Sequence, residues 1–145
     1  MTTTAVETGY VNLVEVHFDE LDPMGLLHNS RYALLFERAL ASFWAGHGHS
    51  FVDGRPTTPD AFNVVRSSCI TYHRPVRGVG EVAVHVWLAR LGESSADYRF
   101  ELTSTDGSVL YAEGGRVVVK LDQATLRPLP WSDESRAVAS TLLRS

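Results

Sequence analysis

Hydrophobic and polar positions follow two different periods in the first part of the chain. Residues 10–18 are mostly β-branched or aromatic and alternate in part with polar residues, which predicts a strand. From position 30 to about 45 the sequence is apolar almost all round, which predicts a helix. Its polar residues Arg31, Arg38 and Ser42 share one narrow stripe. A helix this apolar is expected to be enclosed by the fold rather than to lie on its surface.

The second part of the chain repeats the strand pattern. Gly46 and Gly48 end the helix, and a polar connection of about fifteen residues, 46–60, is long enough to suggest that it covers a site. Four strands and a short amphipathic helix capped by Ser132 then follow, at 61–74, 81–91, 96–105, 108–122 and 131–144. Short turns such as Asp106-Gly107 predict an antiparallel meander. One curved sheet wrapped around one helix satisfies this order, so we expect an α+β fold and one domain over residues 1–145.

Composition narrows the class of protein. Of 145 residues, 44% are hydrophobic and 21% are charged, as in ordinary soluble domains. The net charge of −4 argues against nucleic-acid binding, which needs clustered Lys and Arg. No apolar run approaches the roughly 20 residues of a membrane span, and the N-terminal segment lacks a signal-peptide pattern. Because Cys69 is the single cysteine, a reducing compartment is the simpler assumption, and we expect a cytoplasmic protein with no membrane partner.

The clearest chemical signal is the acidic turn between the first strand and the helix. It contains Asp19, Glu20 and Asp22, and Pro23 and Gly25 supply a fixed and a permissive backbone conformation. The free N–H groups of a helix start come next. An acyl carbonyl in this turn would meet a carboxylate on one side and backbone donors on the other.

The helix start offers three such donors, the N–H groups of Leu27, His28 and Asn29, with Asn29 or Ser30 as N-cap. Attack on an acyl carbonyl needs a nucleophile or an activated water and donors aimed at the developing oxyanion. A carboxylate near a helix N-terminus stays ionised and can do the first job. The turn and the helix start together could therefore hold an acyl carbonyl.

Each of these residues also has a purely structural interpretation. Asp22, which precedes a proline, can bind its own turn backbone, and Asp19 and Glu20 are expected to be solvated turn charges. His28 is equally a pocket donor or a packing residue, and Glu37 is expected to form a structural ion pair. The single cysteine and the spacing of the histidines predict no metal site.

The strand at 61–74 adds further candidates. Ser67 and Ser68 lie where a strand could face a partner's acidic turn, although such serines are more often strand residues with a local backbone bond. Arg74 and Arg77 could bind phosphate groups or the acidic face of a protein, or keep a sheet edge soluble. A roomy hydrophobic pocket is suggested by a set of aromatic residues, namely Phe36, Phe43, Trp44, Phe51 and Phe62.

The order of elements and three segments resemble the hotdog-fold thioesterases of the 4-hydroxybenzoyl-CoA thioesterase type. The segments read FDELDPMGLLHNSRY followed by LFERA, then ITYHRPVRGVGEV, and finally VVVKLDQATLRPLP. Asp22, Gly25 and Tyr32 keep the spacing of that family's acidic turn. Asp19 sits one place earlier than the family's first Asp, and Glu20 takes that place. The resemblance covers nearly the whole chain.

This resemblance implies a curved antiparallel five-stranded sheet around one central helix, and hydrolysis of an acyl-CoA or acyl-carrier-protein thioester. It gives the role of nucleophile or general base to Asp22, and that of backbone donor to Asn29. In many members of the family the donor position carries His or Tyr. Here that position is Asn29, and His28 stands one place earlier. The family works as a dimer or a dimer of dimers with sites between subunits. No cofactor is implied, since coenzyme A or phosphopantetheine enters as part of the substrate.

Two alternatives stay open at this point. A dehydratase on the same fold would need a histidine–carboxylate pair, and His28 has no clear partner in the sequence. A dimeric acyl-binding module without catalysis would use the acidic turn only as structure.

Overall fold

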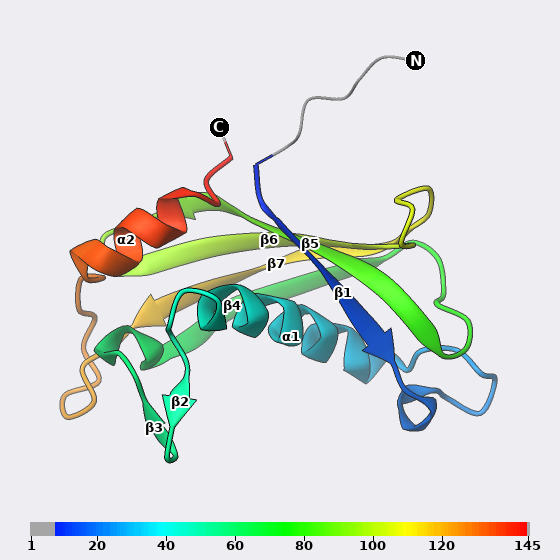
Figure 1. Ribbon diagram of the computed structural model, residues 1–145, viewed down its shortest axis with the longest axis horizontal. Helices are drawn as coiled ribbons and strands as arrows, with labels where there is room; N and C mark the ends of the chain where they lie inside the picture. Colours follow the sequence, from blue (N-terminus) through cyan, green and yellow to red (C-terminus); the bar gives the residue numbers. More distant parts are fainter. Residues whose placement is uncertain (1–7, 145) are drawn as a thin grey trace.

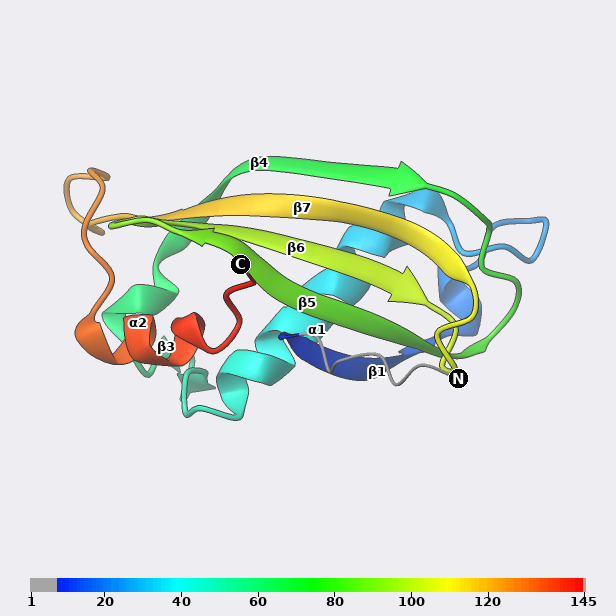
Figure 2. The ribbon, with the colours of Figure 1, turned by 90° about the horizontal axis from the view of Figure 1, so that it is seen from above.

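The computed structural model describes residues 8–144. A curved antiparallel sheet of five strands wraps around helix α1, and a shorter helix, α2, lies near the C-terminal end of α1 (Figures 1 and 2). The elements are β1 (Tyr10–Val16), α1 (Tyr32–Ala45), β2 (Phe51–Val52), β3 (Arg55–Pro56), β4 (Asn63–Tyr72), β5 (Gly80–Leu91), β6 (Ser95–Thr103), β7 (Leu110–Lys120) and α2 (Asp133–Ser140). This is the predicted hotdog fold.

The strands lie in the order β1-β5-β6-β7-β4. β5, β6 and β7 form a meander, but β4 pairs with β7 at the far edge because β1 occupies the free side of β5. The prediction that the strand at 61–74 begins a four-strand meander is therefore wrong. The link at 73–79 crosses the end of the sheet instead (Figure 2), and its Val76 is buried in the core.

Helix α1 fills the concave side of the sheet. Its buried residues are Tyr32, Leu35, Phe36, Ala39, Leu40 and Phe43. Phe36 stacks on Phe100 of β6 with ring centroids 4.1 Å apart. The enclosure is incomplete, since Leu34, Glu37 and Ala41 on another side of the helix are exposed. This chain alone thus covers only part of the apolar helix.

The connection at 46–60 carries structure of its own. It holds the small β2–β3 hairpin, and a 3-10 turn spans Pro59–Ala61.

The last predicted helix is shorter than expected, and Ser132 caps it by accepting a hydrogen bond from the N–H of Ser135. None of the helices formed by residues 8–144 combines the length and apolar character needed to cross a membrane.

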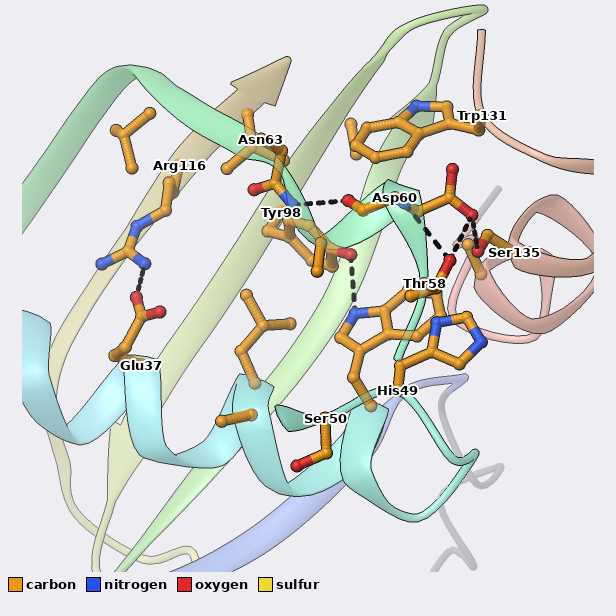
Figure 3. A pocket seen from close by; sticks show the side chains of 18 of the residues that line it. Glu37, His49, Ser50, Thr58, Asp60, Asn63, Tyr98, Arg116, Trp131 and Ser135 are labelled. Atoms are coloured by element: carbon orange, nitrogen blue, oxygen red, sulfur yellow. Dashed lines mark hydrogen bonds and ion pairs between the residues drawn. The ribbon is translucent and has the colours of Figure 1, made fainter. Parts of the chain in front are cut away.

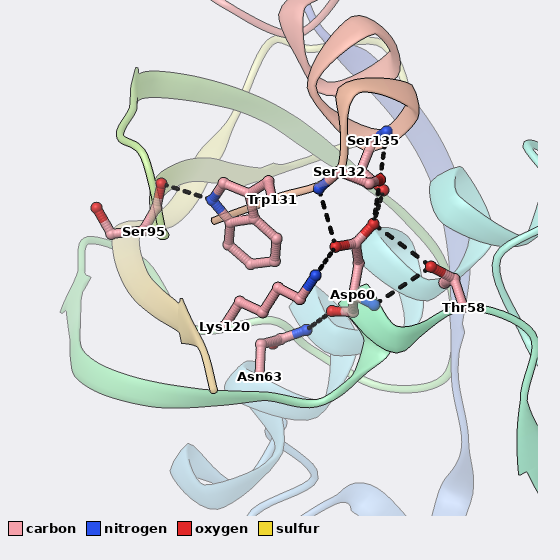
Figure 4. Close-up of polar contacts among 8 residues, drawn as sticks. All are labelled: Thr58, Asp60, Asn63, Ser95, Lys120, Trp131, Ser132 and Ser135. Carbon is pink, nitrogen blue, oxygen red and sulfur yellow. Dashed lines mark hydrogen bonds and ion pairs between the residues drawn. The ribbon is translucent and has the colours of Figure 1, made fainter. Parts of the chain in front are cut away.

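A buried polar cluster joins this connection to β7 and α2 (Figure 4). Lys120 Nζ lies 2.6 Å from Asp60 Oδ1, and both side chains are buried. Ser132 Oγ donates to Asp60 Oδ2 at 2.5 Å, and Ser135 Oγ donates to the same oxygen. Thr58 Oγ1 lies 3.4 Å from Oδ2. One carboxylate therefore ties three separate segments together.

The pairing of β4 with β7 depends on Gly114. A Cβ built at this position would collide with the backbone oxygen of Cys69 on β4. We expect Gly114→Ala to lower the free energy of unfolding by about 1–3 kcal/mol, since the two strands must move apart. Gly46→Ala is the matched control, because its φ is −62° and its Cβ would lie 3.4 Å from the Phe43 oxygen. Urea denaturation of both variants measures the difference, and equal stability would show that the edge strand adjusts freely.

Candidate active site

The acidic turn holds Asp22 in two ways. Its Oδ1 accepts hydrogen bonds from the N–H groups of Met24 at 2.8 Å and Leu26 at 3.1 Å. The Asp22 N–H donates to the Leu26 oxygen at 2.7 Å. Gly25 has a φ of +77°, which favours glycine in this tight turn. The structural interpretation of Asp22 is therefore correct as far as one carboxylate oxygen is concerned.

The same carboxylate borders a cavity of about 490 Å³, called here the Asp22 cavity. Its other lining residues are Pro23, Leu26, Leu27, His28, Asn29, Tyr32, Tyr72, His73, Arg74 and Pro75. Within residues 8–144 only Oδ1 of Asp22 takes part in a hydrogen bond, so Oδ2 keeps its lone pairs for other partners. Asp22 is thus anchored through one oxygen and available through the other.

Only one of the three predicted backbone donors is available. The N–H of Leu27 donates to the Val76 oxygen and that of His28 to the Glu20 oxygen, both at 2.9 Å. The N–H of Asn29 makes no hydrogen bond in the described part of the chain. The structure therefore corrects the expectation of three donors to a single one, at the edge of the Asp22 cavity.

His28 has a local partner. Its Nδ1 accepts from the N–H of Ser30 at 3.1 Å and lies 2.8 Å from Ser30 Oγ. The side chain thereby caps the 3-10 turn Asn29–Arg31 while it also lines the cavity. His28 is exposed rather than packed, and its role as a donor in the cavity stays a prediction.

Two tyrosines support the Asn29 peptide group. Tyr32 is buried and packs edge-to-face on Tyr72, with centroids 4.8 Å apart. Burial raises the pKa of Tyr32 and outweighs the opposing hydrogen bond with the Val76 backbone, so its hydroxyl stays neutral at pH 7. Tyr72 donates its hydroxyl to the Asn29 oxygen at 3.3 Å. The end of β4 therefore anchors the carbonyl of Asn29, the residue whose N–H is the candidate oxyanion donor.

The other predicted site residues differ in whether they line the Asp22 cavity. Arg74 is exposed and lines the Asp22 cavity. Arg77 is exposed but does not line it, although its backbone forms a bridge with Leu26 in the turn. Ser68 lies in the middle of β4, directly paired with Arg116, and does not reach this cavity. The sequence placed Ser68 opposite the acidic turn of a partner chain, so this role stays a prediction.

One expectation about charges is wrong and another is confirmed. Glu20 is buried rather than solvated, because its carboxylate lies 3.4 Å from Arg38 and accepts the His17 N–H at 2.9 Å. Glu37 forms the expected ion pair, with Arg116 of the same chain.

Sequence reasoning missed His73, which lines the Asp22 cavity and lies 3.3 Å from Glu113. Only the strand pairing brings that histidine and that carboxylate together, so the sequence carried no local signal for the pair. Among residues 8–144, no three His, Cys, Asp or Glu side chains gather as a metal-binding group would.

A second cavity, of about 420 Å³, lies between the C-terminal half of α1, the sheet and α2 (Figure 3). We call it the Tyr98 cavity. Of the aromatic residues predicted to line a pocket, Trp44 and Phe51 border it. Phe36 and Phe43 are buried in the core, and Phe62 does not reach the space. The connection at 46–60 forms one wall, as its length suggested.

Comparison with known proteins identifies the family. The family model described as Thioesterase superfamily matches residues 24–111, more than half of the chain. The PA5185 protein from Pseudomonas aeruginosa strain PAO1 has a TM-score of 0.79 at 24% identity, covering 94% of this chain and 92% of its own. The DHNA-CoA thioesterase from Staphylococcus aureus has a TM-score of 0.76 at 19% identity, with coverages of 91% and 89%.

A third solved structure is Slr0204, a 1,4-dihydroxy-2-naphthoyl-CoA thioesterase from Synechocystis, with a TM-score of 0.79 at 9% identity and coverages of 91% and 96%. A search of curated proteins finds no match. The three structures share the overall fold of this chain over most of its length. The matched segment includes the end of the acidic turn, all of α1 and strands β4 to β6. This chain belongs to the thioesterase superfamily.

Proposed function

We propose that this protein hydrolyses the thioester of an acyl-CoA or an acyl carrier protein at the Asp22 cavity. One observation carries the proposal: Asp22 and Asn29 line the same cavity, and among residues 8–144 one carboxylate oxygen of Asp22 and the N–H of Asn29 have no hydrogen-bond partner. The carboxylate would attack the thioester carbon or take a proton from an attacking water. The N–H would bind the oxyanion that forms on the carbonyl oxygen. If the carboxylate attacks, the thiolate leaves an acyl anhydride on Asp22, and a water then hydrolyses it to the free acid. If Asp22 activates water instead, the hydroxide adds to the carbonyl and the thiolate leaves directly. In both cases the thiolate takes up a proton, and the products are a free acid and a thiol.

A second copy of the chain completes the site in this proposal. β4 is a sheet edge whose ten residues are almost all exposed in one chain. Its single charge is Arg66, whereas exposed sheet edges are usually protected by several charges or a proline. We expect two β4 strands to pair antiparallel in a homodimer. Two such dimers can then associate into a tetramer.

This pairing would place the two cavities side by side. Tyr72, near the end of β4, borders the Asp22 cavity, and Asn63, at its start, borders the Tyr98 cavity. An antiparallel β4 pair sets the end of one strand beside the start of the other. The thioester at Asp22 of one protomer would then extend its acyl group toward the Tyr98 cavity of its partner.

Arginine placement supports a phosphate-bearing substrate. Arg74 stands at the mouth of the Asp22 cavity, and Arg77 follows on the same crossing link. The forked guanidinium group binds phosphate through two hydrogen bonds. We propose that these residues contact coenzyme A or the phosphopantetheine of a carrier protein. No other cofactor enters the proposal.

The assay that tests this function is release of free thiol from a panel of acyl-CoA and acyl-carrier-protein esters. Release from at least one ester supports hydrolysis. Saturable binding without release would favour the acyl-binding module. Addition of water to an enoyl ester would favour the dehydratase, for which the His73–Glu113 pair is the structural argument. Both side chains of that pair are about half exposed, while proton transfer in such sites benefits from exclusion of water, so we favour hydrolysis.

The donor role of Asn29 can be separated from its side chain. Proline at this position removes the N–H and suits the first position of a helical turn, and the preceding His28 already has the extended ψ of 138° that proline requires. We expect Asn29→Pro to lower kcat about a hundredfold, as for loss of one oxyanion donor.

Asn29→Ala is the matched control for this variant, because it keeps the N–H and should retain kcat. Steady-state kinetics and thermal unfolding of both variants measure the effect. Equal kcat values in the two variants would remove Asn29 from the mechanism.

A further inference from the structure

A row of hydrogen-bonding side chains crosses three strands on the concave face of the sheet. Tyr98 of β6 is the direct cross-strand partner of Arg116 of β7, and Arg116 is the direct partner of Ser68 of β4. Direct partners in neighbouring strands point to the same face of the sheet. Tyr98 and Arg116 both line the Tyr98 cavity (Figure 3). The rest of the lining combines apolar residues of α1, β6 and β7 with polar residues from other segments, namely His49, Ser50, Thr58, Asp60, Asn63 and Ser135.

The donors of this row are not fully used. Tyr98 accepts a hydrogen bond from Trp44 Nε1 at 3.0 Å, but within residues 8–144 its own hydroxyl hydrogen has no acceptor. Burial raises the pKa of Tyr98 to about 12, against the opposing effect of the Trp44 hydrogen bond, so the hydroxyl remains a donor at any ordinary pH. A neutral donor therefore borders the cavity without a partner.

Arg116 also has hydrogen-bond donors without acceptors. Its side chain is 10% exposed and bonds through Nη1 to Glu37. Its Nε is fully buried without a partner, and Nη2 makes no hydrogen bond within the described residues. The guanidinium also lies over the Phe36 ring, 4.8 Å from its centroid, which fixes its position. Because Nε is enclosed by the protein, Nη2 is the unused donor of Arg116 that a ligand in the cavity can reach.

The charges around the row select the kind of acceptor. Glu37 already balances the charge of Arg116, and Asp60, which also lines the cavity, is balanced by Lys120. A further carboxylate on the ligand would face two anionic side chains. A neutral oxygen meets no such repulsion and satisfies the unused donors.

We propose that the acyl group bound by this protein carries a neutral oxygen acceptor, a keto or hydroxyl oxygen, which Tyr98 and Arg116 bind in the Tyr98 cavity. The inference rests on the proposed thioesterase function and names its substrate class. Tyr98 and Arg116 are then specificity-determining residues. A plain alkyl chain would leave their donors unsatisfied, and the oxygenated chain would be selected.

The test compares kcat/KM for pairs of acyl-CoA esters of equal length, one saturated and the other bearing a keto or hydroxyl group at successive positions. The wild type should favour the best oxygenated ester by about tenfold to a hundredfold, in line with other hydrogen-bonding pockets that recognise a single polar group. Tyr98→Phe and Arg116→Lys should each reduce this ratio several-fold. Arg99→Met should keep the ratio, because Arg99 is exposed and pairs with Asp97 outside the cavity.

Binding separates this inference from the proposed function. Dissociation constants of the same ester pairs, measured by calorimetry, should show the same preference and the same loss in the two cavity variants. Thermal unfolding confirms that each variant is folded. Ready hydrolysis of both esters with equal kcat/KM would overturn the inference and leave the thioesterase function standing. Absence of hydrolysis for every ester would overturn the proposed function, and the binding ratio alone would then decide whether the cavity selects oxygen.

Discussion

Replacing Asp22 with Asn should lower kcat for thioester hydrolysis by about a thousandfold, within the range usual for loss of a positioned catalytic base. The side-chain oxygen of asparagine can still accept the N–H groups of Met24 and Leu26, so the turn keeps its shape. The second oxygen becomes an amide nitrogen, which can neither attack a carbonyl nor accept a proton from water. The variant therefore removes the chemistry and spares the fold.

Thiol release under saturating substrate measures this effect, with thermal unfolding as the check on folding. Asp19→Asn is the matched control, since Asp19 is an exposed carboxylate in the same turn and lines neither cavity. We expect that control to retain the wild-type rate. If Asp22→Asn kept more than a tenth of the activity, the carboxylate would be structural and the proposed mechanism would be wrong.

The second large effect concerns stability. Lys120→Met removes the cation from Asp60 and leaves a buried carboxylate without its charge partner. Breaking a buried pair on one side costs about 3–5 kcal/mol of unfolding free energy. The double variant Asp60→Asn with Lys120→Met should recover part of this loss, because both charges are then absent. Urea denaturation measures all three proteins.

Arg99→Met tests whether burial is the cause. Arg99 pairs with Asp97 at 3.1 Å, but the arginine is 45% exposed, and exposed pairs contribute at most about 1 kcal/mol. A similar cost for Lys120→Met and Arg99→Met would show that the buried cluster adds no more than a surface pair.

The contribution of the buried cluster to the free energy of unfolding should also depend on pH. Burial raises the pKa of Asp60, but hydrogen bonds from Lys120, Ser132 and Ser135 outweigh burial and hold the pKa well below its usual value. The folded-state pKa is thus lower than the unfolded-state pKa of about 3.9. The resulting stabilisation is present above the unfolded pKa and is lost as the pH falls toward the folded pKa. The stability difference between the wild type and Asp60→Asn should therefore shrink below about pH 4.

Local patterns predicted most of the fold. The strand at 10–18, the helix at 30–45 and the later strands were each visible in their own residues, and the order of elements with the acidic turn indicated a hotdog fold. The sequence did not reveal the position of β4, because a link that crosses the sheet and a short hairpin turn look alike in sequence. They can be told apart only when it is known that β1 pairs with β5 on the side away from β6. Strand order is a property of the whole sheet.

The same limit applies to the site. The residues at 22–32 were predicted together because one turn positions them. The loss of two of the three donors depends on Val76 and on the carbonyl of Glu20, which the sequence does not connect with the helix start. The Tyr98–Arg116 neighbours come from two strands, and only their register brings them together.

The crossing link at 73–79 connects the edge strand β4 with the acidic turn. Its Val76 oxygen receives the Leu27 N–H, and its Gly78 N–H donates to the Gly25 oxygen, so the acidic turn is fastened to the segment that leaves β4. The edge strand and the carboxylate therefore cannot shift independently of each other. A change at the free edge of the sheet can therefore reach the acidic turn through the two backbone hydrogen bonds of this link.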